Sequence, residues 1–109
     1  MRHVLPTRRP NVTLSIDWNG HSLDVTIGFA PDTGAPSEVF ANTAKGGDMA
    51  AALADACVIL SIALQNGIAP ADLAKSLGRV PVLWAEEGVT QPASPVGAIV
   101  EAILAEVRP

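Results

Sequence analysis

The sequence predicts an α+β domain: a three-stranded antiparallel sheet, made of an N-terminal β-hairpin plus one short strand, followed by three helices packed on one face. Two alternating apolar runs flank an Asn-Gly pair within residues 12–29, and a long apolar segment with helical spacing covers residues 48–66. A chain of 109 residues has the size of one domain. We assign this domain to residues 11–109 and expect residues 1–10 to form a flexible tail.

The N-terminal hairpin is predicted by its turn and by its alternation together. Asn19-Gly20 separates the two runs, and a two-residue type I′ turn needs positive φ at both central positions, which Asn and Gly tolerate. Such a loop also fixes the register, so that Ile16 lies opposite Leu23 and the apolar side chains share one face. The alternating apolar positions are Val12, Leu14, Ile16, Trp18, Leu23, Val25, Ile27 and Phe29.

A short strand and a long helix are expected next. Residues 30–37 are rich in turn formers, residues 38–42 are typical of a strand, and a helix is predicted from Asp48 to Asn66, closed by Gly67. One stripe of this helix is apolar, but its second half is apolar nearly all round. A helix of this kind is normally covered on more than one side. The stripe and the additional apolar residues are Met49, Leu53, Ala56, Leu60 and Leu64, and Val58, Ile59 and Ile62.

Two further helices complete the predicted order. Pro70 opens a short helix that ends at Leu77, and residues 80–93 are expected to be an irregular connector. Ser94-Pro95 is typical of a helix start. The apolar stripe of the last helix consists of Val96, Ile99, Val100, Ile103 and Val107.

Charge and composition argue against nucleic acid and membrane as partners. The net charge is −4, and the chain has two Trp, two Phe and no Tyr for stacking on bases. Residues 68–81 look like the first half of a helix-turn-helix, but Pro81 and Glu86-Glu87 stand where a recognition helix would be needed. The apolar stretch 56–64 is too short to span a bilayer, and residues 1–10 lack the apolar core of a secretory signal. We therefore expect a cytoplasmic protein.

Few residues in the chain have catalytic or metal-binding character, and we predict no enzyme activity, no metal and no cofactor. Cys57 is the only cysteine, which rules out an intrachain disulfide and a multi-cysteine metal site. It lies within an apolar helix, so we expect a buried and inert thiol. The two histidines, His3 and His21, have no carboxylate or cysteine at metal-ligand spacing. His21 follows a turn and is expected to be a surface residue.

The Lys45-Gly46-Gly47 segment before the long helix has two interpretations. Free N–H groups at a helix start and a nearby lysine attract anions, but the order of residues does not match a Walker phosphate loop. Asp48 also puts a carboxylate at this end as a probable cap. A structural bend is therefore favoured. The candidate contacts for a ligand or a partner are Lys45, Gly46, Gly47, Arg79 and Trp84.

Residues 37–80 carry a set of fixed offsets: an E-[VI]-F strand, a K-x-G turn and a helix ending in L-x-x-G-[IV]-x-P-x-x-L. In this pattern the chain resembles the TSCPD domain, found at the C-terminus of adenosylcobalamin-dependent ribonucleotide reductases and as small stand-alone proteins. The family's Thr-Ser-Cys-Pro-Asp motif should fall near residues 93–97, where the chain reads Ala-Ser-Pro-Val-Gly. The matching residues are Glu38, Val39, Phe40, Lys45, Gly47, Leu64, Gly67, Pro70 and Leu73.

The resemblance implies an accessory domain, because the reductase's catalytic machinery belongs to its barrel domain. Our first hypothesis is a non-catalytic stand-alone domain that binds a protein partner or a small anionic ligand such as a nucleotide. The alternative is a structural or assembly subunit of a larger particle, for example one of phage origin. An enzyme with a nucleotide substrate is least favoured. We also predict a homodimer or a larger assembly, with the long helix or residues 80–85 at the contact.

Overall fold

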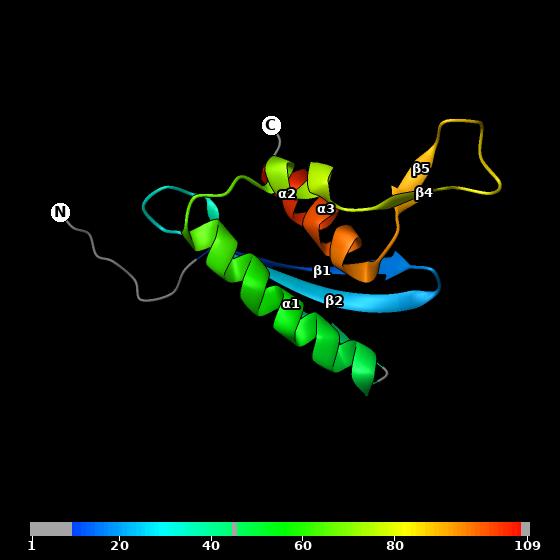
Figure 1. The fold of residues 1–109 in the computed structure, drawn as a ribbon. Coiled ribbons are helices and arrows are strands. Elements are labelled where there is room, and N and C mark those ends of the chain that lie inside the picture. Colours follow the sequence, from blue (N-terminus) through cyan, green and yellow to red (C-terminus); the bar gives the residue numbers. More distant parts are fainter. Residues whose placement is uncertain (1–9, 45, 108–109) are drawn as a thin grey trace.

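The computed structural model describes residues 10–44 and 46–107, so the predicted tail lies outside the described residues except for Pro10. The fold is α+β, with a three-stranded antiparallel sheet and three helices, as predicted (Figure 1). The elements, in chain order, are β1 (Asn11–Trp18), β2 (His21–Phe29), β3 (Pro36–Thr43), α1 (Asp48–Gln65), α2 (Pro70–Ser76), β4 (Arg79–Pro81), β5 (Thr90–Pro92) and α3 (Pro95–Val107).

The β1–β2 hairpin has the predicted turn and register. Asn19 and Gly20 form the turn with φ values of 49° and 80°, the left-handed values that a type I′ turn requires. Ile16 lies opposite Leu23. The hairpin prediction is therefore confirmed in both turn and register.

Strand order in the sheet is β1-β2-β3, so β2 is central and β3 is an edge strand. β3 is three residues longer than predicted and pairs antiparallel with β2. One face of the sheet is apolar and buried, whereas the other is polar and open, with Thr13 and Thr26 joined through their hydroxyls at 3.1 Å. Phe40, which pairs with Thr26 across the sheet, is an exposed aromatic residue on β3.

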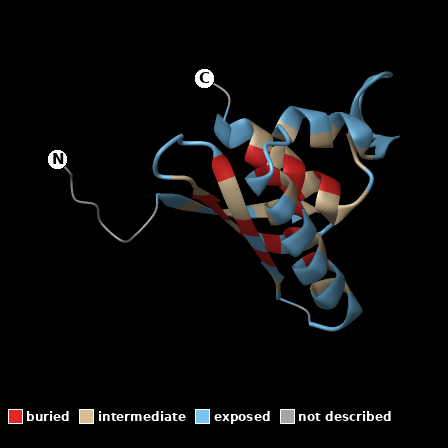
Figure 2. Ribbon diagram, turned by 60° about the vertical axis from the view of Figure 1, so that its left-hand side comes forward, coloured by how far each residue is buried: buried red, intermediate tan, exposed pale blue. Residues whose placement is uncertain are grey.

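The core lies between the buried face of the sheet and the inner sides of α1 and α3, where Figure 2 shows the buried residues. Helix α2 packs mainly against α3 rather than directly on the sheet, which differs from the predicted packing of three helices on one face. The buried apolar residues are Leu23, Val25, Ile27, Val39, Ala41, Leu53, Cys57, Leu60, Leu64, Ile99, Val100 and Ile103.

A glycine stands at each end of α1 and determines where the helix begins and ends. Gly47 is the N-cap, with φ 83° and no side-chain hydrogen bond to the helix. The prediction that Asp48 caps the helix is therefore wrong, and Asp48 stands in the first turn. At the other end Gly67 has φ 85°, its N–H donates to Leu64, and the next N–H, of Ile68, donates to Ala63. This is the Schellman arrangement, for which glycine is favoured.

Residues 80–93 are not the irregular connector that we predicted. Arg79–Pro81 and Thr90–Pro92 pair as a small antiparallel hairpin, β4–β5, which projects away from the rest of the molecule (Figure 1). A proline in each strand removes a backbone donor, which restricts such strands to short edges. Because each strand contains a proline, the sequence did not predict the hairpin.

The start of α3 is the predicted one. The N–H of Gly97 donates to Ser94 Oγ at 3.1 Å, so Ser94 is the cap and Pro95 the first helical residue. Ile99 and Ile103 of the predicted stripe are fully buried, but Val107 is exposed because the helix end extends past the core.

Replacing the turn glycine should weaken the β1–β2 hairpin. In Gly20→Val, a β-branched residue is forced into the left-handed region, and we expect the free energy of unfolding to fall by about 1–2 kcal/mol. Chemical denaturation followed by circular dichroism would measure this loss. Gly46→Ala, in open space before α1, is the control and should change stability little; an equal loss in both variants would contradict the turn assignment.

Candidate functional site

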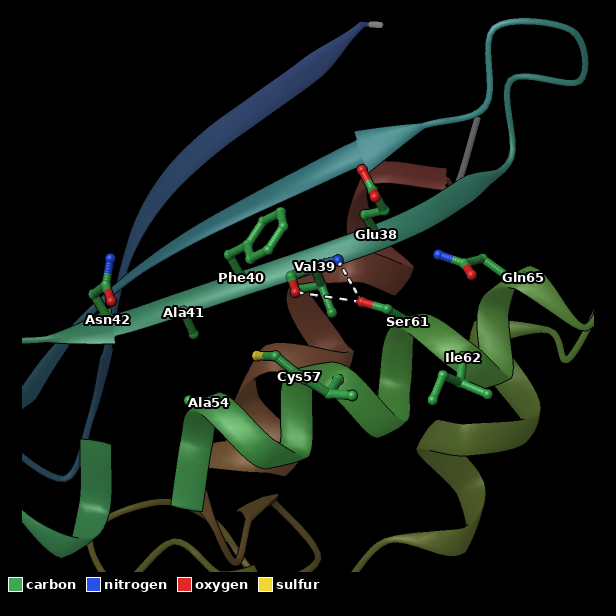
Figure 3. A pocket seen from close by; sticks show the side chains of 11 residues that line it. Glu38, Val39, Phe40, Ala41, Asn42, Ala54, Cys57, Ser61, Ile62 and Gln65 are labelled. Carbon is green, nitrogen blue, oxygen red and sulfur yellow. Dashed lines mark hydrogen bonds between the residues drawn. The ribbon is translucent and has the colours of Figure 1, made fainter. Parts of the chain in front are cut away.

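Helix α1 runs along the free edge of β3 and bonds the backbone of that strand through side chains (Figure 3). Ser61 Oγ accepts the N–H of Val39 at 3.0 Å and donates to the carbonyl of the same residue at 3.4 Å. One turn further along the helix, Gln65 Nε2 donates to the carbonyl of Ser37 at 3.0 Å. The helix thus occupies the edge of β3, where another strand could otherwise pair.

Cys57 continues the same row one turn earlier. It is buried, as predicted, next to the backbone of Ala41. Burial raises the pKa of the Cys57 thiol, and a backbone hydrogen bond from Ala41 opposes this only in part. Four residues of a helix span about 6 Å, and two residues of a strand span about 6.6 Å. Side chains four residues apart on α1 can therefore reach backbone groups that are two residues apart on β3.

A groove of about 660 Å³ follows this edge, between α1 and the outer side chains of β3. Phe40 stands on the strand side, and Val58 and Ile62 stand on the helix side. In Figure 3 the Phe40 ring lies across the strand from the helix. The lining residues are Glu38, Val39, Phe40, Ala41, Asn42, Ala54, Cys57, Val58, Ser61, Ile62 and Gln65.

The outer side of α1 is apolar and open. Val58, Ile59 and Ile62 are each more than half exposed. Within residues 10–44 and 46–107 no second element covers them, although a helix that is apolar nearly all round was expected to be covered on more than one side. Among the described residues, α1 also has the length and apolar composition that crossing a membrane would require. In this fold it packs against the sheet through Leu53 and Leu60.

A second candidate surface is the β4–β5 hairpin, whose base is firmly held. The guanidinium of Arg79 on β4 donates to Thr90 Oγ1 at 2.8 Å and to the Thr90 carbonyl at 3.0 Å, and pairs with the Glu101 carboxylate of α3. Trp18 Nε1 donates to the carbonyl of Pro92 at 2.9 Å. These contacts fix the hairpin to α3 and to the end of β1.

The tip of this hairpin presents two apolar side chains to solvent. Leu83 is 82% exposed and Trp84 is 94% exposed. The loop that carries them is closed by a hydrogen bond from the N–H of Val82 to the carbonyl of Val89 at 3.0 Å. Trp is one of the three residue types that are enriched at the hot spots of protein interfaces.

The structure separates the site residues that the sequence suggested. Lys45 lies outside the described residues, and Gly46 and Gly47 are exposed at the start of α1. Arg79 is engaged in the hairpin base, and Trp84 lies at its tip. In Figure 1 the start of α1 lies at the bottom of the molecule and the β4–β5 hairpin projects at the top, so the structure does not bring Gly46 and Gly47 together with Trp84.

The remaining residues considered for catalysis or metal binding are the histidines and any cluster of possible metal ligands. His21 stacks on Trp18 with ring centroids 6.0 Å apart, and His3 lies outside the described residues. Within residues 10–44 and 46–107, no three His, Cys, Asp or Glu side chains gather as a metal site would require. The groove and the hairpin tip are the two candidate sites that these residues leave.

Comparison with known proteins assigns the family. The family model described as "TSCPD domain" matches residues 2–106, essentially the whole chain, so the protein belongs to the TSCPD family. Neither the search of curated proteins nor the search of solved structures gave a match. The segment in which we looked for the family's motif, residues 93–97, forms the capped start of α3.

Removing the Ser61 hydroxyl should destabilise the fold. Ser61→Ala leaves the N–H of Val39, which is almost fully buried, without its acceptor, and we expect a loss of about 1–3 kcal/mol in the free energy of unfolding. Urea denaturation would measure it. Ser76→Ala is the matched control, because the Ser76 hydroxyl bonds the Asp72 carbonyl in an exposed helix, and a change below about 0.5 kcal/mol is expected there. Equal effects would contradict a special role for Ser61.

Cys57 should be dispensable but should make stability depend on pH. Cys57→Ala should fold and lose about 1–2 kcal/mol at neutral pH through lost packing. The folded pKa is raised above the ordinary 9.0, so the thiol's contribution is complete below pH 9.0 and is lost as pH rises through the folded pKa. Denaturation of both proteins between pH 7 and 10.5 should show the gap between them narrowing above pH 9. A constant gap would contradict the burial argument.

Proposed function

We propose that this TSCPD-family chain is a non-catalytic accessory domain that binds a protein partner through the tip of its β4–β5 hairpin. The single observation that carries the proposal is the exposed Leu83-Trp84 pair on a hairpin whose base is clamped. Trp is the residue type most often found among the few that dominate binding energy. A rigid base also lowers the entropy lost on binding, because the hairpin does not need to become ordered.

The family supports an accessory role. TSCPD domains are known from the C-termini of ribonucleotide reductases, where they accompany a separate catalytic domain. Cys57, the one thiol of this chain, is buried with a raised pKa, and such a thiol is poorly suited to redox chemistry. An oxidoreductase activity would therefore belong to a neighbouring protein or domain.

A structural or assembly subunit of a larger particle is the second candidate. It is favoured by the presence of two apolar surfaces, the hairpin tip and the outer side of α1, on separate parts of the molecule (Figure 1). Two different contact surfaces allow one chain to join more than one neighbour. Growth of the purified protein into species much larger than a dimer would favour this candidate over the first.

A small anionic ligand, such as a nucleotide, at Lys45-Gly46-Gly47 is a narrower version of the binding hypothesis. Calorimetric titration with nucleotides tests it directly. Stoichiometric binding that is lost in Lys45→Ala and retained in Trp84→Ala would replace the protein-partner proposal with a ligand-binding one.

The proposal is tested by crosslinking and then by affinity. A photoreactive phenylalanine analogue at Ala85, the exposed neighbour of Trp84, should capture one specific protein in the cells of origin, while the same analogue at Thr13, on the polar face of the sheet, should not. With the captured protein purified, Trp84→Ala should weaken binding by about 30-fold or more, the effect of losing a residue worth about 2 kcal/mol. Unchanged affinity in Trp84→Ala would overturn the proposal.

A further inference from the structure

The outer side of α1 and the neighbouring strand form a second apolar surface, which we name the α1–β3 face: Phe40, Val58, Ile59 and Ile62. These side chains are between 55% and 67% exposed. Three of them line the groove beside β3, and Ile59 extends the surface around the helix. Monomeric proteins seldom leave a contiguous apolar patch of several hundred Å² without a binding role.

We propose that the occupant of the α1–β3 face is a second copy of this chain, which forms a two-fold dimer through α1. This inference concerns a surface other than the β4–β5 hairpin and does not depend on the proposed function. A dimer of this kind needs a face with enough apolar area for a stable interface and with a surface that is complementary to itself. The face should also suit a second copy better than a peptide or a membrane.

The size of the face matches what a stable dimer needs. A standard interface buries about 800 Å² per partner, and homodimer interfaces are about 65% apolar, so each copy must supply about 500 Å² of apolar surface. Four large side chains that are more than half exposed, together with the exposed alanines of α1, supply an area on the order of 500 Å².

An extended peptide is disfavoured as the occupant. Addition of a strand to an open sheet edge draws its affinity from main-chain hydrogen bonds. On β3 these groups are already engaged, because Ser61 bonds both backbone groups of Val39 and Gln65 bonds the carbonyl of Ser37. What remains for an occupant is side-chain packing against the helix.

A membrane surface is also disfavoured. Helices that lie on membranes carry Lys and Arg on their polar side, which attract anionic lipid headgroups. The sequence of α1, residues 48–65, contains Asp48 and Asp55 and no basic residue. The helix would thus bring acidic groups to an anionic surface.

The α1–β3 face is complementary to itself under a two-fold axis. If two copies of α1 cross in antiparallel orientation at the level of Leu60, residues equally distant from that level come to face each other. Val58 of one copy then faces Ile62 of the other, and the Asp55 carboxylate faces the Gln65 amide. Gln65 uses one donor on Ser37 and its amide has a second. The Asp55 carboxylate of α1 therefore meets a donor instead of a second carboxylate.

Mass measurement tests this dimer. Light scattering with size-exclusion chromatography at micromolar concentrations should give twice the 11.2 kDa of one chain. Ile62→Asp should raise the dissociation constant by about 100-fold or more, because it buries an unpaired charge at the centre of the interface. Its thermal unfolding at dilution, where the chain is monomeric, should match that of the wild type, since Ile62 is exposed in the single chain.

Leu83→Asp is the matched control, because it places the same charge on an apolar position of the hairpin tip that is even more exposed than Ile62. It should leave the dimer mass unchanged. In a Cys57→Ala background, Ile59→Cys should be linked into a covalent dimer by a short bismaleimide reagent, and Leu83→Cys should not. A monomeric mass at 100 μM, a dimer insensitive to Ile62→Asp, or a dimer lost in Leu83→Asp instead would each overturn the inference.

Discussion

The edge of β3 is the constraint on which the rest of the structure depends. An antiparallel sheet of three strands has two edges, and the β3 edge is covered by side chains of α1 rather than by a further strand. The Ser61 hydroxyl forms hydrogen bonds with the N–H and the carbonyl of Val39, and the Gln65 amide donates to the carbonyl of Ser37. These bonds set the distance and the rotation of α1 relative to the sheet, and they place Leu53 and Leu60 in the core.

That rotation also determines what α1 leaves exposed. When the row that contains Cys57 and Ser61 faces the strand, the next residues around the helix, Val58, Ile59 and Ile62, face the groove and solvent. The apolar surface is therefore a direct consequence of how the edge is covered. Changing the helix orientation to bury it would remove the hydrogen bonds from a buried backbone, which costs about 1–3 kcal/mol for each unsatisfied group.

The sequence predicted those features in which local and long-range signals agree. Asn19-Gly20 and the flanking alternation required one register, and that register is found. The predicted stripe of α1 also faces the core, with Leu53, Leu60 and Leu64 buried. The sequence could not indicate which of the additional apolar residues stay exposed, because the second half of the helix is apolar nearly all round. The β4–β5 hairpin was missed because its strands are three residues long and each holds a proline. Neither alternation nor strand propensity is detectable over so few residues.

The altered segment at residues 93–97 shows how such a domain can keep its fold while its sequence departs from the family's motif. Ser94 caps α3, Pro95 fits the first helical position, and a Cβ on Gly97 would approach Pro92 Cβ to 3.0 Å. Each of these three residues thus has a packing or capping role that needs no thiol and no carboxylate. Pro92 also accepts the hydrogen bond from Trp18. One residue of β5 therefore contacts both the start of α3 and the end of β1, and these two contacts hold the base of the projecting hairpin in place.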